Sequence, residues 1–253
     1  MSALERDGYT RSSDMKANSG GGPTGRRARP KWLGTLPAGE ARALREAARV
    51  RSYQAGESVF GPTREPSEIY VLEGGLIRIH RVTPTGAEFT LRYVQPGEVF
   101  GDIAVMSGHP RETFAQAKTA SKVLHLPRAA FLAVLRAHSS VLYSVTKRIA
   151  RRFIELQSRA EELIFLDART RLARVLLRLA GEHGYRSGQG LTIGLPLTHE
   201  EVATLIGTSR QTASLYLGEL TKAGLVARRG RQVILPNPGA LETIASVSRD
   251  QDS

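Results

Sequence analysis

The sequence predicts an α+β protein in which a β-rich region, a long helix and a small helical domain follow one another. Three observations predict this order. Short β-rich runs separated by turn residues occupy residues 51–126, apolar residues recur at heptad spacing within residues 128–166, and a broken helix followed by two short apolar runs occupies residues 197–236. Many short strands at regular spacing are typical of a barrel or jelly roll.

These sequence patterns divide the chain into five segments. They are a basic tail at 1–30, a β-roll domain at 31–127, a long helix region at 128–166, a winged helix-turn-helix at 167–236 and a flexible C-terminal tail at 237–253. The basic tail is rich in Gly, Ser and Arg without periodicity, which predicts disorder. It could touch nucleic acid, but a solvated tail is the favoured interpretation.

The β-rich domain is recognised by its runs and its turns. "IYVLEGGLIRIHRV", "EFTLRYV", "TFAQAKT" and "KVLHL" are rich in β-branched and aromatic residues, and Gly-Gly and Pro-Gly pairs separate several of them. The stretch "LIRIHRV" alternates. We therefore expect Ile77, Ile79 and Val82 in one environment, and Arg78 and His80 in the other. A short helical pattern over residues 36–50 precedes the strands.

The long helix carries a heptad seam of about three repeats. Its members are Leu142, Thr146, Ile149, Phe153, Leu156, Ala160 and Leu163. Such a stripe either packs on its own domain or pairs with a second helix. Because the flanking faces are densely charged, the pattern favours self-association, and the six apolar members are the predicted dimer interface.

The stretch "LTHEEVATLIGTSRQTASLYLGELTKAGLV" predicts two helices joined by a three-residue turn. Thr198 and Glu201 form a capping box, Gly207 permits the turn, and Ser209 can cap the second helix. The small residue Ala203 lets the two helices cross closely. Upstream, Asp167 caps another helix that ends near Gly181 or Gly184, and residues 181–190 are expected to form a polar loop.

The second helix of the pair has the residue types that read bases in the major groove. Arg bonds bidentately to guanine, Gln does so to adenine, and Ser and Thr contact phosphate. After it, two apolar runs flank "RRGR", which predicts a basic β-hairpin, or wing. The candidate DNA-binding residues are Thr198, Ser209, Arg210, Gln211, Thr212, Ser214, Tyr216, Arg228, Arg229 and Arg231.

Composition agrees with a polyanionic partner. The chain has 36 Lys and Arg against 24 Asp and Glu, a net charge of +12, and residues 168–235 carry ten basic and four acidic residues, a net +6. There is no cysteine, which excludes a disulfide framework, a thiol switch and a cysteine-ligated iron–sulfur cluster. With neither an apolar signal segment nor a membrane-length apolar run, a cytoplasmic location is expected.

The sequence resembles the catabolite activator and fumarate-nitrate reductase regulator (CRP/FNR) family, in which the same motifs follow one another in the same order along the chain. The resemblance is carried by "QPGEVFGDIAVMSGHPRETFAQAKT", "VTKRIARRF", "LIFLDARTRLARVLL" and "TSRQTASLYLGELTKAGLV". It implies a cyclic-nucleotide-binding-type β-roll, a long dimerisation helix and a winged helix-turn-helix. It also implies a homodimer on a two-fold symmetric operator, transcriptional activation, and RNA polymerase contact near residues 181–190.

The effector positions depart from the cyclic AMP pattern of this family. The expected Gly-Glu, Arg-Ser and Thr-Ser pairs are here Gly101-Asp102, Arg111-Glu112 and Leu156-Gln157. Glu112 would place a carboxylate near a bound phosphate, so cyclic AMP is expected to bind weakly or not at all. The alternatives are another small acid, such as 2-oxoglutarate, or no effector. Arg111 either binds the ligand or forms a salt bridge with Glu112 or Asp102.

The recognition helix departs as well, since Gln211 and Leu215 replace a Glu and an Arg of the catabolite activator. The operator should therefore differ. No nucleophile–base constellation, metal-ligand spacing or phosphate-cradling loop appears, which argues against an enzyme. The competing functions are a cyclic-nucleotide-type sensor without DNA binding and a non-specific architectural DNA-binding protein.

Overall fold

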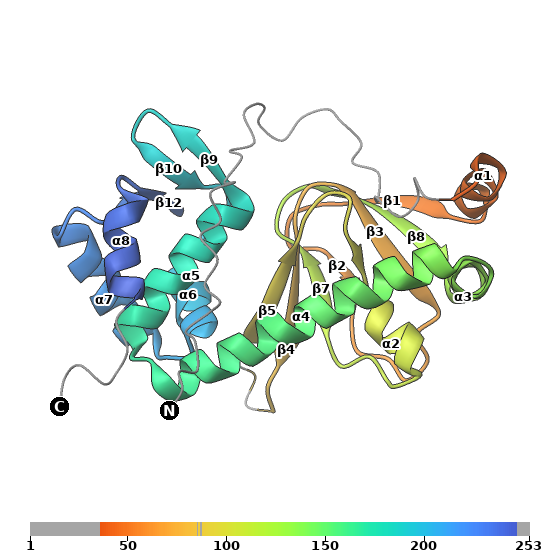
Figure 1. Cartoon of the computed structure of the whole chain (residues 1–253), viewed down its shortest axis with the longest axis horizontal. Helices are drawn as coiled ribbons and strands as arrows, with labels where there is room; N and C mark the ends of the chain where they lie inside the picture. The colour runs from red at the N-terminus through yellow and green to blue at the C-terminus, as the bar shows by residue number, and fades with distance from the viewer. Residues whose placement is uncertain (1–35, 85, 87, 247–253) are drawn as a thin grey trace, which may run out of the picture.

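The structure is a computed structural model, and it describes residues 36–84, 86 and 88–246. Two lobes are joined by the long helix α4 (Ser139–Phe165), which runs along the first lobe and ends at the second (Figure 1). The predicted basic tail, residues 1–30, lies outside the described residues.

The first lobe is a β-roll of two four-stranded antiparallel sheets, with strand orders β1-β8-β3-β6 and β2-β7-β4-β5. The strands are β1 Arg49–Tyr53, β2 Ser58–Phe60, β3 Glu68–Gly74, β4 Ile77–Val82, β5 Glu88–Val94, β6 Val99–Phe100, β7 Phe114–Ala117 and β8 Ser121–Pro127. Leu72 and Phe100 from one sheet pack against Ile77 and Val94 from the other. This core confirms the predicted β-roll.

Strand β4 departs from the simple alternation expected of it. Arg78 and His80 are buried like their apolar neighbours, whereas Val82 is exposed. Arg78 donates to Glu88, and the His80 ring stacks on Phe114. The pairing of β4 with β5 also shifts register between Ile79 and His80, so strict alternation ends there.

The helical region after β8 is two helices rather than one. Helix α3 (Arg128–Ala137) ends at His138, whose extended backbone (φ −127°, ψ 98°) turns the chain by 111° into α4. Phe131 of α3 and Val141 and Val145 of α4 are buried on the β-roll. Among the described residues, no single helix has the length and hydropathy of a membrane span, although the bent pair of α3 and α4 reaches them when counted together.

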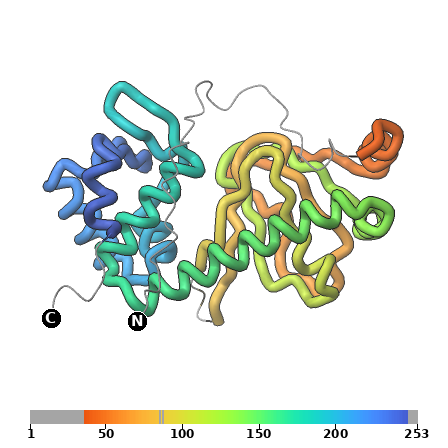
Figure 2. The backbone as a smooth tube through the Cα atoms, viewed as in Figure 1, coloured from red at the N-terminus to blue at the C-terminus, as the bar shows by residue number. Residues whose placement is uncertain are grey.

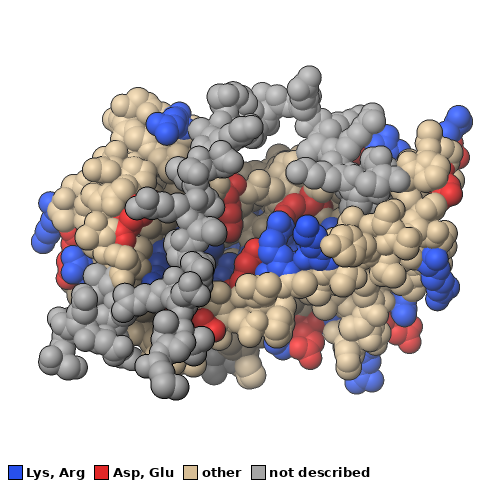
Figure 3. All heavy atoms as spheres, viewed as in Figure 1, with Lys and Arg blue, Asp and Glu red and all other residues tan. Residues whose placement is uncertain are grey.

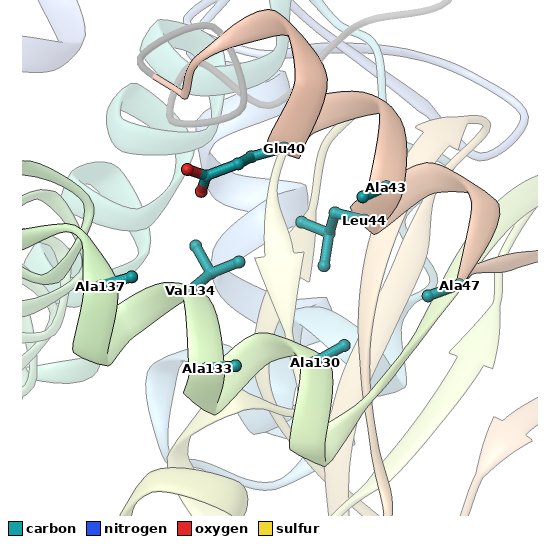
Figure 4. A pocket seen from close by; sticks show the side chains of 8 residues that line it. All are labelled: Glu40, Ala43, Leu44, Ala47, Ala130, Ala133, Val134 and Ala137. Atoms are coloured by element: carbon teal, nitrogen blue, oxygen red, sulfur yellow. The ribbon is translucent and has the colours of Figure 1, made fainter.

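Helix α1 (Ala38–Glu46) lies against α3 through small side chains. Leu44 is buried between them, and Ala43 and Ala130 lie on the two walls of a groove of about 290 Å³ (Figure 4). Glu40 lies at one end of the groove and bonds to His138. Small residues on both helices thus line a groove beside the bend.

The second lobe packs four helices around one sheet of order β11-β12-β10-β9. Its elements are α5 Ala168–His183, β9 Gly184–Ser187, β10 Gly190–Ile193, α6 His199–Ile206, α7 Arg210–Lys222, β11 Ala227–Arg229, β12 Gln232–Leu235 and α8 Pro238–Ala245. Asp167 caps α5 by accepting from the Thr170 backbone N–H, as predicted.

Two expectations for this lobe are wrong. Residues 181–190 do not form a polar loop: α5 continues to His183, and β9 and β10 then form a hairpin that projects from the lobe (Figure 2). Residues 237–253 are not a flexible tail throughout, because α8 packs on α5 with Leu241 fully buried. The Ala245 carbonyl also accepts from Arg174.

Candidate nucleic-acid interface and ligand cavity

The break between α6 and α7 has the predicted local geometry. The Thr198 hydroxyl accepts from the Glu201 backbone N–H, and the Glu201 carboxylate accepts from the Thr198 backbone N–H, which completes the capping box. Gly207 ends α6 in the left-handed region (φ 64°, ψ 51°), and Ser209 caps α7 by accepting from the Thr212 N–H. Both predicted helices and their turn are thus confirmed.

Gly207 is favoured by its backbone conformation, and it also lies against the end of the long helix. A Cβ built on Gly207 would lie 2.5 Å from the Leu163 side chain at the end of α4. Carbon atoms do not approach so closely, so the Leu163 side chain would have to change its rotamer to make room for a larger residue. The turn is therefore a place where α4 touches the second lobe.

Helix α7 buries one face and exposes the other. Ala213, Leu217 and Leu220 lie in the core of the second lobe. Of the predicted DNA-binding residues, Ser209, Arg210 and Gln211 are exposed at its N-terminal end. Thr212, Ser214 and Tyr216 are half-buried, and Thr198 is half-buried at the start of α6. The structure thus brings these residues together around the start of α7.

The wing forms as predicted, but its three arginines differ in exposure. Strands β11 and β12 pair, Gly230 turns the chain between them, and Arg229 and Arg231 are exposed. Arg228 instead turns inward, where it donates to the Leu197 carbonyl at 3.1 Å. Because its guanidinium is already engaged by the protein, Arg228 does not stand free at the wing tip.

Arg228 also meets a residue that the sequence motifs did not single out. His199, the first residue of α6, bonds to Arg228 through Nε2 and to the Ser214 hydroxyl through Nδ1 at 2.5 Å. This imidazole joins the wing to the recognition helix. A histidine directly after a helix N-cap was visible in the sequence, but nothing local indicated partners 15 and 29 positions away.

A cavity of about 660 Å³ lies between the β-roll, α4 and the helix-turn-helix. Gly101, Asp102, Arg111, Glu112 and Leu156 all line it, as the effector pattern predicts. Gln157 does not line it and is exposed on α4. The far wall comes from the second lobe, through residues that include Arg171, Thr204 and Gly207. A molecule in this cavity would touch both lobes.

Arg111 is held by the protein itself. It is 5% exposed and donates to the Glu68 carbonyl at 2.9 Å, the Gly101 carbonyl at 3.1 Å and the Tyr70 hydroxyl. Its guanidinium also lies 4.1 Å from the centre of the Phe60 ring. The alternative interpretation, a salt bridge from Arg111 to Glu112 or Asp102, is wrong, because Glu112 pairs with Arg81 and Asp102 with two arginines of α4.

Asp102 is buried and ties the cavity wall to the long helix. Its carboxylate accepts from Arg148 at 2.9 Å and from Arg152 at 3.3 Å. Burial disfavours its ionised form, but the positive charges of Arg152, Arg148 and Arg92 outweigh this cost and lower the pKa of Asp102. Both carboxylate oxygens are thus engaged, which the sequence pattern did not indicate.

The two lobes are also joined outside the cavity. Glu201 of α6, already a member of the capping box, accepts from Lys118 of the β-roll at 2.5 Å and from the Tyr93 hydroxyl at 3.4 Å. Gln95 donates to the Glu182 carbonyl at 2.6 Å. In Figure 3, basic and acidic side chains lie next to one another near the middle of the face shown.

The heptad seam of α4 is largely bare. Phe153 is 61% exposed, Leu156 60% and Leu163 50%, and Leu142, Thr146 and Ala160 are exposed as well. Ile149 is the exception, because it packs partly on the β-roll core. The stripe therefore does not pack wholly on its own domain, which was the alternative to self-association.

Comparison with known proteins agrees with this arrangement. Residues 50–138 match the cyclic nucleotide-binding domain family, and residues 170–244 match the Crp-like helix-turn-helix domain family. The cyclic AMP receptor protein of Thermus thermophilus is 32% identical over 195 residues, covering 77% of this chain and 87% of its own. The global nitrogen regulator of Synechococcus elongatus is 27% identical over 194 residues, covering 76% and 87%.

A solved structure is similar over the same range. The crystal structure of a CRP-family transcriptional regulator from Thermus thermophilus superposes with a TM-score of 0.66 at 31% identity. The match covers 78% of this chain and 97% of the other. Together, the capped helix pair, the wing, the β-roll and these relatives show that the chain belongs to the CRP/FNR family of DNA-binding transcription regulators.

Proposed function

We propose that the chain is a non-enzymatic transcription activator that binds a two-fold symmetric operator as a homodimer, with α7 in the major groove and the wing on the backbone. The observation that carries this proposal is the exposed start of α7, where Ser209, Arg210 and Gln211 accompany the exposed wing residues Arg229 and Arg231. The N–H groups of a helix start attract phosphate, while Arg and Gln can reach base edges.

Two further surfaces are assigned by this proposal. The seam of α4 would face its counterpart in a second copy, since like faces meet across a two-fold axis. The β9–β10 hairpin projects from the second lobe at the position where the family resemblance places RNA polymerase contact. Tyr185, Arg186 and Ser187 are exposed on β9, so the hairpin can offer a surface to the polymerase.

Selection from a random duplex library tests the DNA-binding proposal, and genomic footprinting then locates the sites. We expect a recovered sequence with two inverted half-sites whose centres are about one helical turn, roughly 34 Å, apart. An affinity for the recovered duplex equal to that for random DNA would instead indicate an architectural DNA-binding protein.

Removing a wing charge should weaken binding without changing specificity. Arg229→Ala is expected to reduce affinity for operator and random duplexes by similar factors, because a phosphate contact carries no sequence information. The slope of log affinity against log salt should become shallower by about one. Fluorescence anisotropy over a salt series measures both.

Arg186→Ala is the matched control, because Arg186 is an exposed arginine on β9, at the opposite edge of the same sheet. It should leave the salt slope near that of the unmodified protein. An unchanged slope in Arg229→Ala would argue against contact between the wing and the backbone.

We propose that the cavity takes an organic anion other than cyclic AMP. Arg111, at the position that would hold the phosphate, is engaged by two carbonyls and a hydroxyl, and Asp102, at the position that would hold the ribose, is ion-paired to α4. Leu156 adds an apolar wall. Arg111 and Arg159 of this lining both donate only to uncharged partners, so each keeps a positive charge that can attract an anion.

Titration calorimetry should detect no cyclic AMP binding at micromolar concentrations. Replacing the two departing residues that line the cavity, as Glu112→Ser with Leu156→Thr, should raise the affinity, because this removes the opposing carboxylate and supplies hydroxyl groups. A thermal-shift panel of organic acids that includes 2-oxoglutarate then searches for the native ligand. Micromolar binding of cyclic AMP by the unmodified chain contradicts the prediction.

A further inference from the structure

His199 lies where the three parts of the DNA-binding surface meet. Its Nδ1 is 2.5 Å from the Ser214 hydroxyl of α7, and its Nε2 bonds to the Arg228 guanidinium of β11. Arg228 is itself fixed by the carbonyls of Leu197 and Gly230 at 3.1 and 3.3 Å. One half-buried ring thus connects the first helix of the pair, the recognition helix and the wing.

The chemistry of the partners determines the protonation state of the ring. A guanidinium can only donate hydrogen bonds, so Nε2 of His199 must be an unprotonated acceptor. The single proton of the neutral ring then lies on Nδ1 and is donated to the Ser214 hydroxyl oxygen. The Ser214 hydroxyl hydrogen is then not used in the bond to His199 and can be donated to another acceptor.

The surroundings of His199 favour the same uncharged form. Burial lowers the pKa of His199 first, and the positive charges of Arg228 on β11 and Arg210 on α7 lower it further. Since an unperturbed histidine loses its proton near pH 6.5, His199 is uncharged at neutral pH.

We propose that His199 is a positioning residue that holds the wing and the recognition helix in one arrangement while its ring is uncharged, and that its protonation lowers the specificity of DNA binding. This inference rests on the proposed function. With a proton on Nε2, the His199 ring and the Arg228 guanidinium would both be hydrogen-bond donors and would both carry a positive charge, so they would repel each other. Arg228 would then leave the ring, and Ser214 would lose its fixed orientation.

The two consequences of protonation act differently on specific and random DNA. Released Arg228 and charged His199 add positive charge beside the phosphates, which favours every duplex alike. Loss of the fixed arrangement also misaligns the side chains of α7 that reach base edges, and this affects operator DNA alone. Acidification should therefore lower the ratio of operator affinity to random affinity, even where random affinity rises.

The test measures this ratio for the full chain at about pH 8 and about pH 4.5, because the pKa of His199 lies below the ordinary histidine value and protonation of the ring needs a lower pH, at constant ionic strength. The probes are a duplex selected from a random library by the unmodified chain and a scrambled duplex of the same composition. We expect the ratio to fall about tenfold on acidification, the effect of one lost base-directed contact.

The variant His199→Gln distinguishes a positioning role that depends on protonation of the ring from a role in the fold alone. The glutamine amide oxygen can accept from Arg228 but does not titrate, so this variant should keep the ratio at about pH 8 and lose its pH dependence. His199→Ala should have a low ratio at both pH values. His138→Gln, which changes a histidine in the bend between α3 and α4, should retain the full pH response. Thermal melts at both pH values confirm that each variant is folded.

The inference is overturned if the ratio of the unmodified chain does not change with pH, or if His199→Gln keeps the decrease. Failure of the full chain to select any duplex is a different result, because it contradicts the proposed DNA binding itself.

Discussion

Phe153→Glu should convert the protein from a dimer to a monomer in sedimentation or light scattering. Phe153 is at the centre of the bare seam and 61% exposed, and burying such a side chain is worth about 1.5–3 kcal/mol in each copy. In a two-fold interface the substitution occurs twice, and the two carboxylates would lie close together. Operator affinity should then fall by about 100-fold or more, because two linked half-sites become independent.

The same change should hardly affect the fold of one copy. Phe153 does not line the cavity and belongs to none of the core clusters of the described residues. Ser158→Glu is the matched control, since it adds the same charge to an exposed position on the opposite side of α4. It should remain dimeric. A Phe153→Glu protein that stays dimeric at micromolar concentration would place the dimer contact elsewhere.

The parts of the fold that could be predicted from sequence are those set by neighbouring residues. The capping box needs Thr198 and Glu201, three positions apart, and the turn needs Gly207 and Ser209. Their geometry is nearly independent of the rest of the chain. The β9–β10 hairpin was equally local, because its two strands adjoin in sequence, but the glycines and polar residues of 181–190 indicated a loop.

The parts that could not be predicted depend on contacts between distant segments. Leu76 and Tyr93 belong to the core of the second lobe, which thus reaches the outer face of the β4–β5 pair. Arg78, paired with Tyr93 in register, is buried for that reason, although its position in the strand indicated an exposed face. No local pattern shows which lobe will cover a strand.

The candidate sites divide in the same way. Gly101, Asp102 and Arg111, which the resemblance to a motif predicts as effector positions, line the cavity, but their partners within the protein were not predicted. Asp102 finds Arg148 and Arg152 at separations of 46 and 50 residues. Residue type indicates that such a carboxylate needs a cation, and only the fold decides which cation reaches it.

Arg210→Ala should cost about 1–3 kcal/mol in operator binding per half-site and relax the base preference at one position of that half-site. Arg210 is the first residue of α7 and is exposed, so its side chain can reach a base edge without disturbing the core. Repeating the duplex selection with the variant, beside anisotropy on operator and random DNA, measures both effects.

Lys222→Ala is the control for charge, because Lys222 is the exposed last residue of the same helix, far from its N-terminal end. It removes the same positive charge but should leave the base preference intact and change affinity only slightly. If Arg210→Ala instead lost operator and random binding equally, Arg210 would be a phosphate contact. Gln211, the second residue of α7, would then be the first residue of this helix that contacts base edges.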